Sequence, residues 1–274
     1  MKTSDAPAAP QVRRPTTVEE LAALVATNPG VTVLGGGTLE VPRWADPSVR
    51  PARVVLLNDV PELTVVDTGL CGAGVTLARA AGHARLPLAL RRAARSIAGP
   101  ALRSTATVGG NVAGVSPGCL AVALLSLGAE AEVLQRDGSR TWRELARLLQ
   151  GPNQDGYVIL AFRWPGTPEA SSFRKVTQSA GGGVPLVTVS VSVSGFNGER
   201  KLWRAAVGGR GFLPQRLPEL EHQLAADPNA KSLPERLVGP QDIEFRSIGD
   251  EGARRFRVAL IERQVRAAVL SIWE

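Results

Sequence analysis

Cysteine is scarce in this sequence. Cys71 and Cys119 are its two cysteines, and neither belongs to a CxxC pair. Iron–sulfur clusters and structural zinc sites need closely grouped cysteine or histidine ligands, and a disulfide framework needs several cysteines at short spacings. The sequence therefore excludes all three kinds of site. If the protein handles electrons, it does so without a metal of its own.

Aromatic side chains and lysine are also rare. The chain has six Phe, five Trp and one Tyr; its formal net charge is +7, and most of its positive residues are arginines. Single-stranded nucleic acids bind where bases can stack on aromatic rings. We therefore expect no nucleic-acid partner, although a basic nucleic-acid binder stays an alternative. We interpret most arginines as solvated helix faces, and part of the charge as a docking surface for an acidic partner.

Long apolar runs are missing as well. No window approaches the roughly 20 apolar residues needed to span a bilayer. The first residues, "MKTSDAPAAPQVRRP", lack the apolar centre of a signal peptide. We expect no membrane span and a cytoplasmic location.

Two glycine-rich stretches stand out instead: "VLGGGTLEV" (33–41) and "TATVGGNVAGVSPG" (105–118). Successive N–H groups that no Cβ shields can form a concave anion site after a strand. A tight turn can explain one such stretch, but each has a threonine beside its glycines, Thr38 and Thr107. Together they predict a shared diphosphate, and so a dinucleotide cofactor. Neither matches the Walker or Rossmann spacing.

The remaining pattern predicts an α+β protein with two lobes. Helical spacing occupies 16–28, 76–84, 87–98 and 141–150, and a buried helix and a strand precede an Asp-Gly hairpin turn at 137–138. β-branched apolar runs at 52–60, 63–75 and 184–195 predict strands, with a second turn near 197–198. A long amphipathic helix closes the chain over 251–270. We expect a flexible tail over 1–14, one domain over 15–165 and another over 166–274.

The stretch "ALRSTATVGGNVAGVSPG" (101–118) resembles the signature of the FAD-binding medium subunit of molybdenum hydroxylases, the xanthine dehydrogenase and carbon monoxide dehydrogenase family. "VLGGGTLEV" resembles the first loop of that family. "SSFRKVTQSAGGGVPLVTVSVSV" (171–193) and "DEGARRFRVALIERQVRAAV" (250–269) are similar to its C-terminal domain. The resemblance covers the chain in order from residue 15 onward.

This resemblance implies a two-lobed FAD-binding domain of the PCMH (vanillyl-alcohol-oxidase-like) type, followed by a smaller α+β domain. It implies an oxidoreductase subunit that carries FAD, holds no metal and has no catalytic residue of its own. Electrons would come from an iron–sulfur small subunit, and a molybdenum-cofactor large subunit would oxidise the substrate. The expected cofactor-binding residues are Leu34, Gly35, Gly36, Gly37, Thr38, Leu39, Thr107, Val108, Gly109, Gly110, Asn111, Ser116 and Lys175.

Three departures from the family pattern keep other functions open. The family has acids at the positions of Leu39 and Leu120, and in this chain Glu40 follows Leu39. The stretch "QSAGGGVPL" (178–186) stands where the family usually has a basic residue and an Asp. An alkyl side chain cannot replace a carboxylate hydrogen bond. One alternative is therefore a paralogue that binds FAD weakly and acts as a scaffold. Another is a single-chain flavin reductase of the cell-wall precursor type, for which the sequence offers no convincing proton donor.

Overall fold

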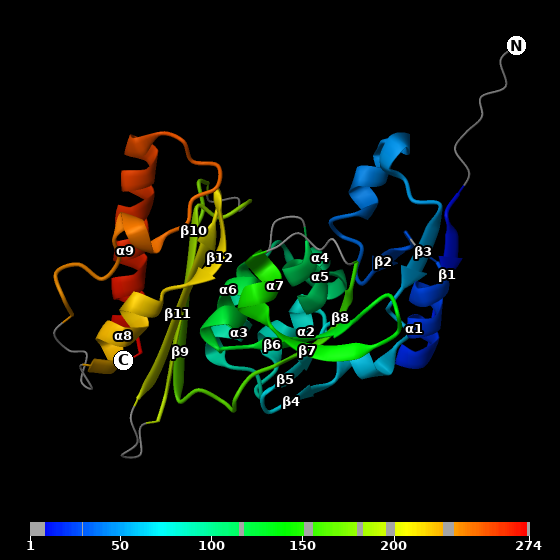
Figure 1. Cartoon of the computed structure of the whole chain (residues 1–274), viewed down its shortest axis with the longest axis horizontal. Helices are drawn as coiled ribbons and strands as arrows, with labels where there is room; N and C mark the ends of the chain where they lie inside the picture. Colours follow the sequence, from blue (N-terminus) through cyan, green and yellow to red (C-terminus); the bar gives the residue numbers. More distant parts are fainter. Residues whose placement is uncertain are drawn as a thin grey trace, which may run out of the picture.

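The N-terminal part of the chain is a small parallel sheet with one helix. The computed structural model describes residues 9–28, 30–114, 118–150, 156–179, 183–195, 201–226 and 233–272. In the first of three sheets, β1 (Gln11–Arg13), β3 (Arg53–Leu56) and β2 (Thr32–Leu34) lie in the order β1-β3-β2. The helix α1 (Val18–Thr27) and the short turns η1 (Val41–Ala45) and η2 (Pro47–Val49) complete this part, which is blue in Figure 1.

The helix α1 begins where the sequence predicts. Thr17 Oγ1 accepts a hydrogen bond of 3.1 Å from the backbone N–H of Glu20, and acids occupy the first turn. Such a cap satisfies a donor that the helix itself cannot use. Leu21 and Val25 lie on the buried face of the helix.

The second sheet is antiparallel and forms the centre of the molecule. Its strand order is β4-β5-β8-β6-β7, after the short turn η3 (Pro61–Thr64). The strands are β4 (Val66–Asp67), β5 (Leu70–Gly72), β6 (Glu130–Leu134), β7 (Arg140–Glu144) and β8 (Val158–Arg163). The helices are α2 (Leu77–Gly82), α3 (Leu88–Arg95), α4 (Pro100–Thr105), α5 (Val108–Ala113), α6 (Cys119–Ser126) and α7 (Leu145–Gln150).

The third sheet has helices on both faces (Figure 1). Its antiparallel strands β12 (Phe212–Arg216), β11 (Leu202–Gly209), β10 (Val187–Ser194) and β9 (Ala170–Val176) lie in that order. The helices α3 and α6 pack on one face. The helices α8 (Pro218–Ala226) and α9 (Glu251–Leu270) pack on the other, with the turn η4 (Pro240–Asp242) between them in sequence. The expected α+β class is confirmed.

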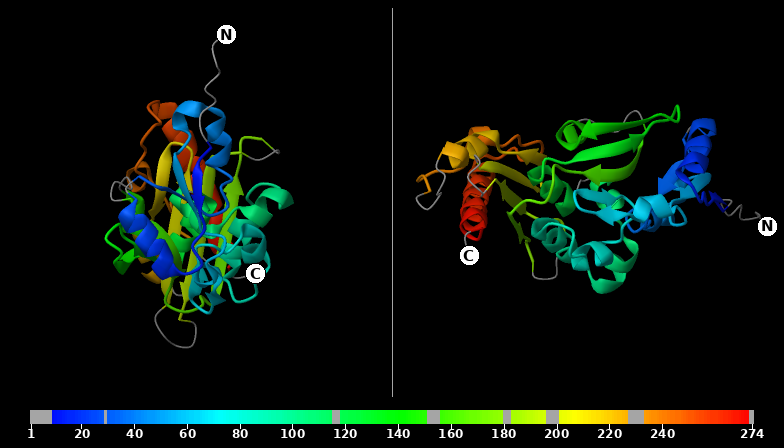
Figure 2. Two further views of the ribbon diagram at one scale, coloured as in Figure 1. Left: turned by 90° about the vertical axis from the view of Figure 1, so that its right-hand side faces the viewer. Right: turned by 90° about the horizontal axis from the view of Figure 1, so that it is seen from below.

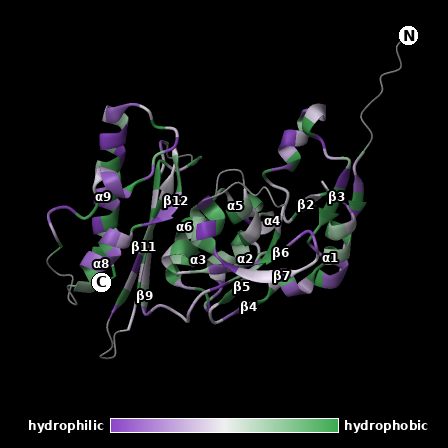
Figure 3. Cartoon of the chain, in the orientation of Figure 1, coloured by the Kyte–Doolittle hydropathy of each residue, from purple (hydrophilic) through white to green (hydrophobic). Residues whose placement is uncertain are grey.

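Hydrophobicity follows these layers. Every residue of α6 is buried, as a helix between two layers requires. The helix α9 carries both purple and green along its length in Figure 3, because its buried residues, among them Ile261 and Val265, occupy one side of an otherwise polar helix. It spans residues 251–270, as predicted.

One predicted helix is partly wrong. Residues 141–144 belong to strand β7, and the helix α7 begins only at Leu145. Trp142 pairs with Glu132 across the strands, and the Arg163 guanidinium lies 4.3 Å from the centre of its ring. This cross-strand packing outweighs the local helical spacing. The Asp-Gly turn before it is confirmed, with Gly138 at φ +84°, whereas the turn near 197–198 lies outside the described residues.

Candidate functional site

The two glycine-rich loops touch each other. A Cβ placed on Gly35 would lie 2.7 Å from Thr107 Oγ1, and one placed on Gly36 would overlap the backbone carbonyl of Thr105. The first loop follows β2 and the second leads into α5. Two segments about 70 residues apart in the sequence therefore form one surface, as the shared-site prediction requires.

The second loop has little hydrogen-bonding capacity left in its backbone N–H groups. Val108 donates to Val75 O at 2.9 Å and Gly109 donates to Ala73 O at 2.8 Å. Gly110 donates to Thr107 Oγ1 at 3.1 Å, and Asn111 donates to Thr107 O at 3.0 Å. The N–H groups of residues 108–111 thus already have acceptors within the protein. This part of the sequence interpretation, in which both loops offer free N–H groups, is corrected.

The first loop is different. Among the described residues, none accepts a hydrogen bond from the backbone N–H groups of residues 35–38. The four residues are only half buried, and Gly37 takes a positive φ of +66° that turns the chain. Four successive donors without a protein acceptor suit an anion, because each N–H dipole can point at it.

Two cavities open on this double loop. The first, of about 250 Å³, has an apolar wall formed by Leu77, Ile97 and Leu102. The second, of about 330 Å³, lies toward Arg136 and Tyr157. Ligand pockets usually measure about 300 to 1,000 Å³, so the second cavity lies at the small end of that range and the first lies just below it. Six residues line both cavities, and these are Val33, Gly35, Glu40, Thr107, Gly110 and Ala113.

Most of the expected cofactor-binding residues line these cavities. The first cavity is lined by Leu34, Gly35, Gly36, Gly37, Thr38, Leu39, Thr107, Gly110 and Asn111, and the second by Gly109 as well. Val108 is fully buried and lines neither. Ser116 lies outside the described residues. Lys175 lies apart from both cavities, with Nζ 2.8 Å from Ser96 O. The binding roles themselves remain a prediction.

Sequence reasoning missed Glu40. The family acid aligns with Leu39, which lines the first cavity alone, whereas Glu40 lines both cavities. Its carboxylate lies 3.1 Å from Arg43 Nη1, which balances part of its charge. A carboxylate is therefore still present at the site, one position later than in the family pattern. The sequence signal that could have identified Glu40 is an acidic residue directly after Leu39, at the end of the glycine-rich loop.

Leu120 and Asn111 have structural roles here. Leu120 is fully buried in α6, so the missing acid at this position leaves no gap at the cavities. Its backbone N–H donates to Asn111 Oδ1 at 3.1 Å, and the Gly118 N–H donates to Asn111 O at 2.9 Å. Asn111 thus ties the second loop to the start of α6 while it lines the first cavity.

A clamped turn forms part of the first cavity wall. Arg103 Nη1 donates to the carbonyl oxygens of Ile97 at 3.1 Å and Ala98 at 2.5 Å. Ala98 has φ +47°, a left-handed conformation that is costly for a residue with a Cβ. Among the described residues, no other non-glycine residue takes a positive φ. Strain of this kind persists where surrounding contacts impose it, often at functional sites.

The two thiols are unsuited to metal binding. Burial raises the pKa of the Cys71 thiol to about 12 and also raises the pKa of the Cys119 thiol. A thiol must lose its proton to bind a metal or attack an electrophile. No group of three or more potential metal ligands occurs within the part of the chain that the structure describes.

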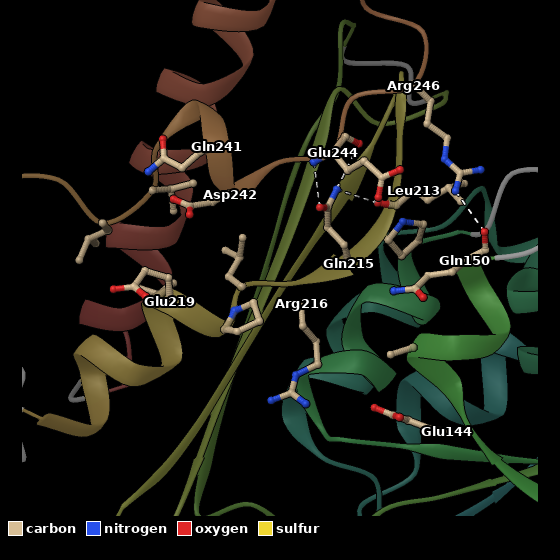
Figure 4. Close-up of a pocket in the computed structure, with 17 residues that line it drawn as sticks. Glu144, Gln150, Leu213, Gln215, Arg216, Glu219, Gln241, Asp242, Glu244 and Arg246 are labelled. Carbon is tan, nitrogen blue, oxygen red and sulfur yellow. Dashed lines mark hydrogen bonds between the residues drawn. The ribbon is translucent and has the colours of Figure 1, made fainter.

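A further hollow of about 680 Å³ lies between α7 and the C-terminal elements β12, α8 and η4 (Figure 4). Several of its polar groups are bonded within the protein: the Glu244 N–H donates to Gln215 Oε1 at 3.0 Å, and Arg246 donates to Gln150 O at 3.1 Å. Arg216 pairs with Glu221 at its edge. None of its lining residues borders either cavity at the glycine loops. It is a seam between secondary-structure elements, separate from the glycine-rich loops.

Comparison with known proteins decides the family. The model of the FAD-binding domain in molybdopterin dehydrogenase matches residues 8–167, which include both loops and both cavities. This chain belongs to that family. FAD is accordingly its cofactor, and the chain is a subunit of a molybdenum-containing oxidoreductase.

Several known proteins resemble the whole chain. The nicotine 6-hydroxylase medium subunit of Paenarthrobacter nicotinovorans is 27% identical, over 93% of this chain and 94% of that protein. Reconstituted CO dehydrogenase from Oligotropha carboxidovorans has the same fold, with a TM-score of 0.81 and 21% identity over 97% of this chain and 98% of that one. Quinoline 2-oxidoreductase from Pseudomonas putida 86 matches with a TM-score of 0.75 and 20% identity, over 97% of each chain.

The site fits the chemistry of FAD. A diphosphate needs N–H donors, which the first loop supplies, and flat rings need apolar walls, which both cavities have.

The expectation that the chain has no membrane span also holds within the described residues, where every helix is too short or too polar to cross a bilayer.

Proposed function

We propose that this chain passes electrons from the iron–sulfur clusters of a partner subunit, through FAD, to a final acceptor. Bound FAD supplies the chemistry, because a flavin accepts electrons singly and releases them singly or in pairs. The protein's own residues bind and orient it. The observation that carries this proposal is the pair of touching loops, one with free N–H donors and one with a Cβ-free surface at Gly110.

The residues divide the work of binding. The N–H groups of residues 35–38 would hold the diphosphate, and Thr107 fixes the start of the second loop beside them. Glu40 would accept a hydrogen bond from a hydroxyl group of the cofactor, since it lines both cavities. Each cavity would take one of the two ring systems that flank the diphosphate of FAD. We also propose that the residues named from the sequence that line the two cavities contact the cofactor, and that the chain divides into domains over 15–165 and 166–274.

The partners follow from the same proposal. The nicotine hydroxylase relative is named a medium subunit, which supports an assembly with an iron–sulfur small subunit and a molybdenum-cofactor large subunit. Both thiols are buried, and the described residues contain no cluster of side chains that could hold a metal ion. We therefore expect the electrons to come from a partner subunit.

A split in activity tests this electron path. In the assembled complex, substrate should reduce the iron–sulfur clusters and then bleach the flavin absorption near 450 nm, about where protein-bound flavins absorb. The Gly110→Val complex should still reduce its clusters but deliver no electrons to the acceptor. Unchanged delivery to the acceptor by a variant complex that has lost its flavin would refute the path through this flavin.

A weak-binding scaffold is the second candidate, favoured by the exposed apolar Leu39 at the rim of the first cavity. It predicts that the wild-type complex purifies colourless in the flavin band yet keeps its subunits together. Stoichiometric flavin in that complex would rule it out.

A further inference from the structure

One long stretch of the chain contains no acidic residue. From Thr68 to Ala129 the sequence has no Asp or Glu and no Phe, Tyr or Trp, but it has six arginines: Arg79, Arg85, Arg91, Arg92, Arg95 and Arg103. This stretch includes the helices α2, α3 and α4, of which α2 packs against both of the others. We call their exposed side the α2–α4 face.

The positive charge on the α2–α4 face has almost no counter-charge among the residues that the structure describes. Arg79, Arg85, Arg92 and Arg95 are exposed. Arg85 pairs with Asp67 at 3.1 Å, with both side chains more than 60% exposed. Arg79 and Arg95 bind backbone carbonyls, and Arg92 forms no ion pair with the described residues. Exposed pairs such as Arg85–Asp67 contribute little to stability.

The other side of the central sheet is built differently. There Arg140 pairs with Glu132 at 2.8 Å, Arg163 pairs with Glu130 at 2.6 Å, and Arg147 pairs with Glu144 at 3.2 Å. In the right-hand view of Figure 2, the teal helices lie on one side of the central part and the green β6–β7 hairpin on the other. Positive charge without a paired carboxylate is therefore a feature of the α2–α4 face and not of the β6–β7 side of the central sheet.

The α2–α4 face also borders the cofactor cavity. Leu77 from α2, Ile97 and Ala98 from the turn after α3, and Leu102 from α4 line the first cavity. Leu102 is 51% exposed and Leu88 is 43% exposed, so apolar side chains lie among the arginines. Arginine and apolar anchors together are typical of protein interfaces, and a single-sign field speeds association with a surface of opposite charge.

We propose that the α2–α4 face docks an acidic surface of the iron–sulfur subunit. This inference rests on the proposed function, because an electron donor must sit beside the flavin and this face adjoins the flavin cavity. A protein occupant fits better than nucleic acid, since the stretch offers no aromatic ring for base stacking. The partner's matching feature is a cluster of Asp and Glu around an apolar contact for Leu88 and Leu102.

Charge reversal on two faces tests the proposal. Arg92→Glu/Arg95→Glu changes the α2–α4 face, and Arg236→Glu/Arg263→Glu makes the same change in net charge at exposed arginines of the C-terminal part. Each is co-expressed with the iron–sulfur and molybdenum subunits. We expect the first variant to bind the iron–sulfur subunit at least tenfold more weakly at low salt, and the second to match wild type. Arg92→Gln/Arg95→Gln should give an intermediate loss and a flatter salt dependence.

The outcomes are distinguishable. Flavin content and thermal midpoint of each isolated chain show whether the variants fold and keep FAD. If wild type binds the iron–sulfur subunit and both reversals bind it equally well, the docking face is wrong while the proposed function stands. If wild type itself never binds that subunit, the proposed function fails. Loss of DNA binding in the first variant, with assembly intact, would overturn the proposal in favour of nucleic acid.

Discussion

The two glycine-rich loops look alike in the sequence but contribute differently to the site. The first keeps its N–H groups at residues 35–38 without protein acceptors, whereas the second has every N–H of residues 108–111 bonded within the protein. The glycines differ as well. Gly36 is needed because the Thr105 carbonyl lies against it, while a Cβ on Gly110 would meet only Thr107 Oγ1, at 3.0 Å. The first loop therefore supplies hydrogen-bond donors for the cofactor, and the second supplies a surface without side chains against which the cofactor can lie.

The largest expected effect separates these two kinds of glycine. Gly36→Ala places a Cβ into the backbone of Thr105 and Ala106 and should lower the free energy of unfolding by about 3 kcal/mol. Gly110→Ala should change it by less than about 1 kcal/mol, because Gly110 lies in a helix and faces a cavity. Urea unfolding of both variants checks this. Equal losses would contradict the distinction.

Gly109 belongs with Gly36 rather than with Gly110. A Cβ on Gly109 would lie 2.6 Å from the Cβ of Ala73. A larger residue there disturbs packing together with any effect on the cofactor, so loss of flavin in Gly109→Val says little about the site. Gly110 is the cleaner position for that question.

The next effect concerns the acid at the first loop. Glu40→Leu should weaken FAD binding about tenfold, or about 1.4 kcal/mol, because a hydroxyl of the cofactor loses its acceptor. Glu40→Gln keeps an acceptor oxygen and should lose less. Flavin fluorescence quenching measures both affinities. Tighter binding in both variants would mean that repulsion from the diphosphate dominates at this position.

A smaller effect concerns the clamped turn beside the second loop. Arg103→Ala should weaken FAD binding about fivefold, or about 1 kcal/mol, because Ala98 then relaxes from its left-handed conformation. Adding Ala98→Gly should restore most of the affinity, since glycine adopts that conformation without strain. No rescue in the double variant would show that Arg103 acts by another route.

The smallest effect concerns the cap of the second loop. Thr107→Val removes the acceptor for the Gly110 N–H and should cost about 1 kcal/mol of stability. Thr17→Val removes the equivalent cap of α1 and serves as the matched control. Both should lower the thermal midpoint similarly, but only Thr107→Val should weaken FAD binding. If both leave the FAD affinity unchanged, Thr107 has a purely structural role.

Much of this arrangement is predictable from local patterns. The helix α9, a threonine at the start of α1, the Asp-Gly turn at 137–138 and the pairing of two glycine-rich loops all follow from residue types and spacing. The strand at 140–144 does not, because its conformation depends on pairing with β6. Such tertiary contacts override local preference.

The details of the site depend on three-dimensional contacts in the same way. Two of the acceptors for the second loop are the carbonyl oxygens of Ala73 and Val75, which lie more than 30 residues earlier in the chain. No local pattern shows that these carbonyls use up the N–H groups of Val108 and Gly109. Likewise, the sequence alone does not reveal that Glu40 rather than Leu39 lines both cavities.

The most direct test of the site is the flavin content of Gly110→Val beside wild type, each purified with its partner subunits and then incubated with excess FAD. The account predicts one FAD per wild-type chain. It predicts at least a hundredfold loss of affinity in the variant, with its circular dichroism and thermal midpoint almost unchanged, because the branched side chain fills the surface shared by the two cavities. A folded variant that binds FAD as tightly as wild type would contradict the placement of the cofactor at these loops.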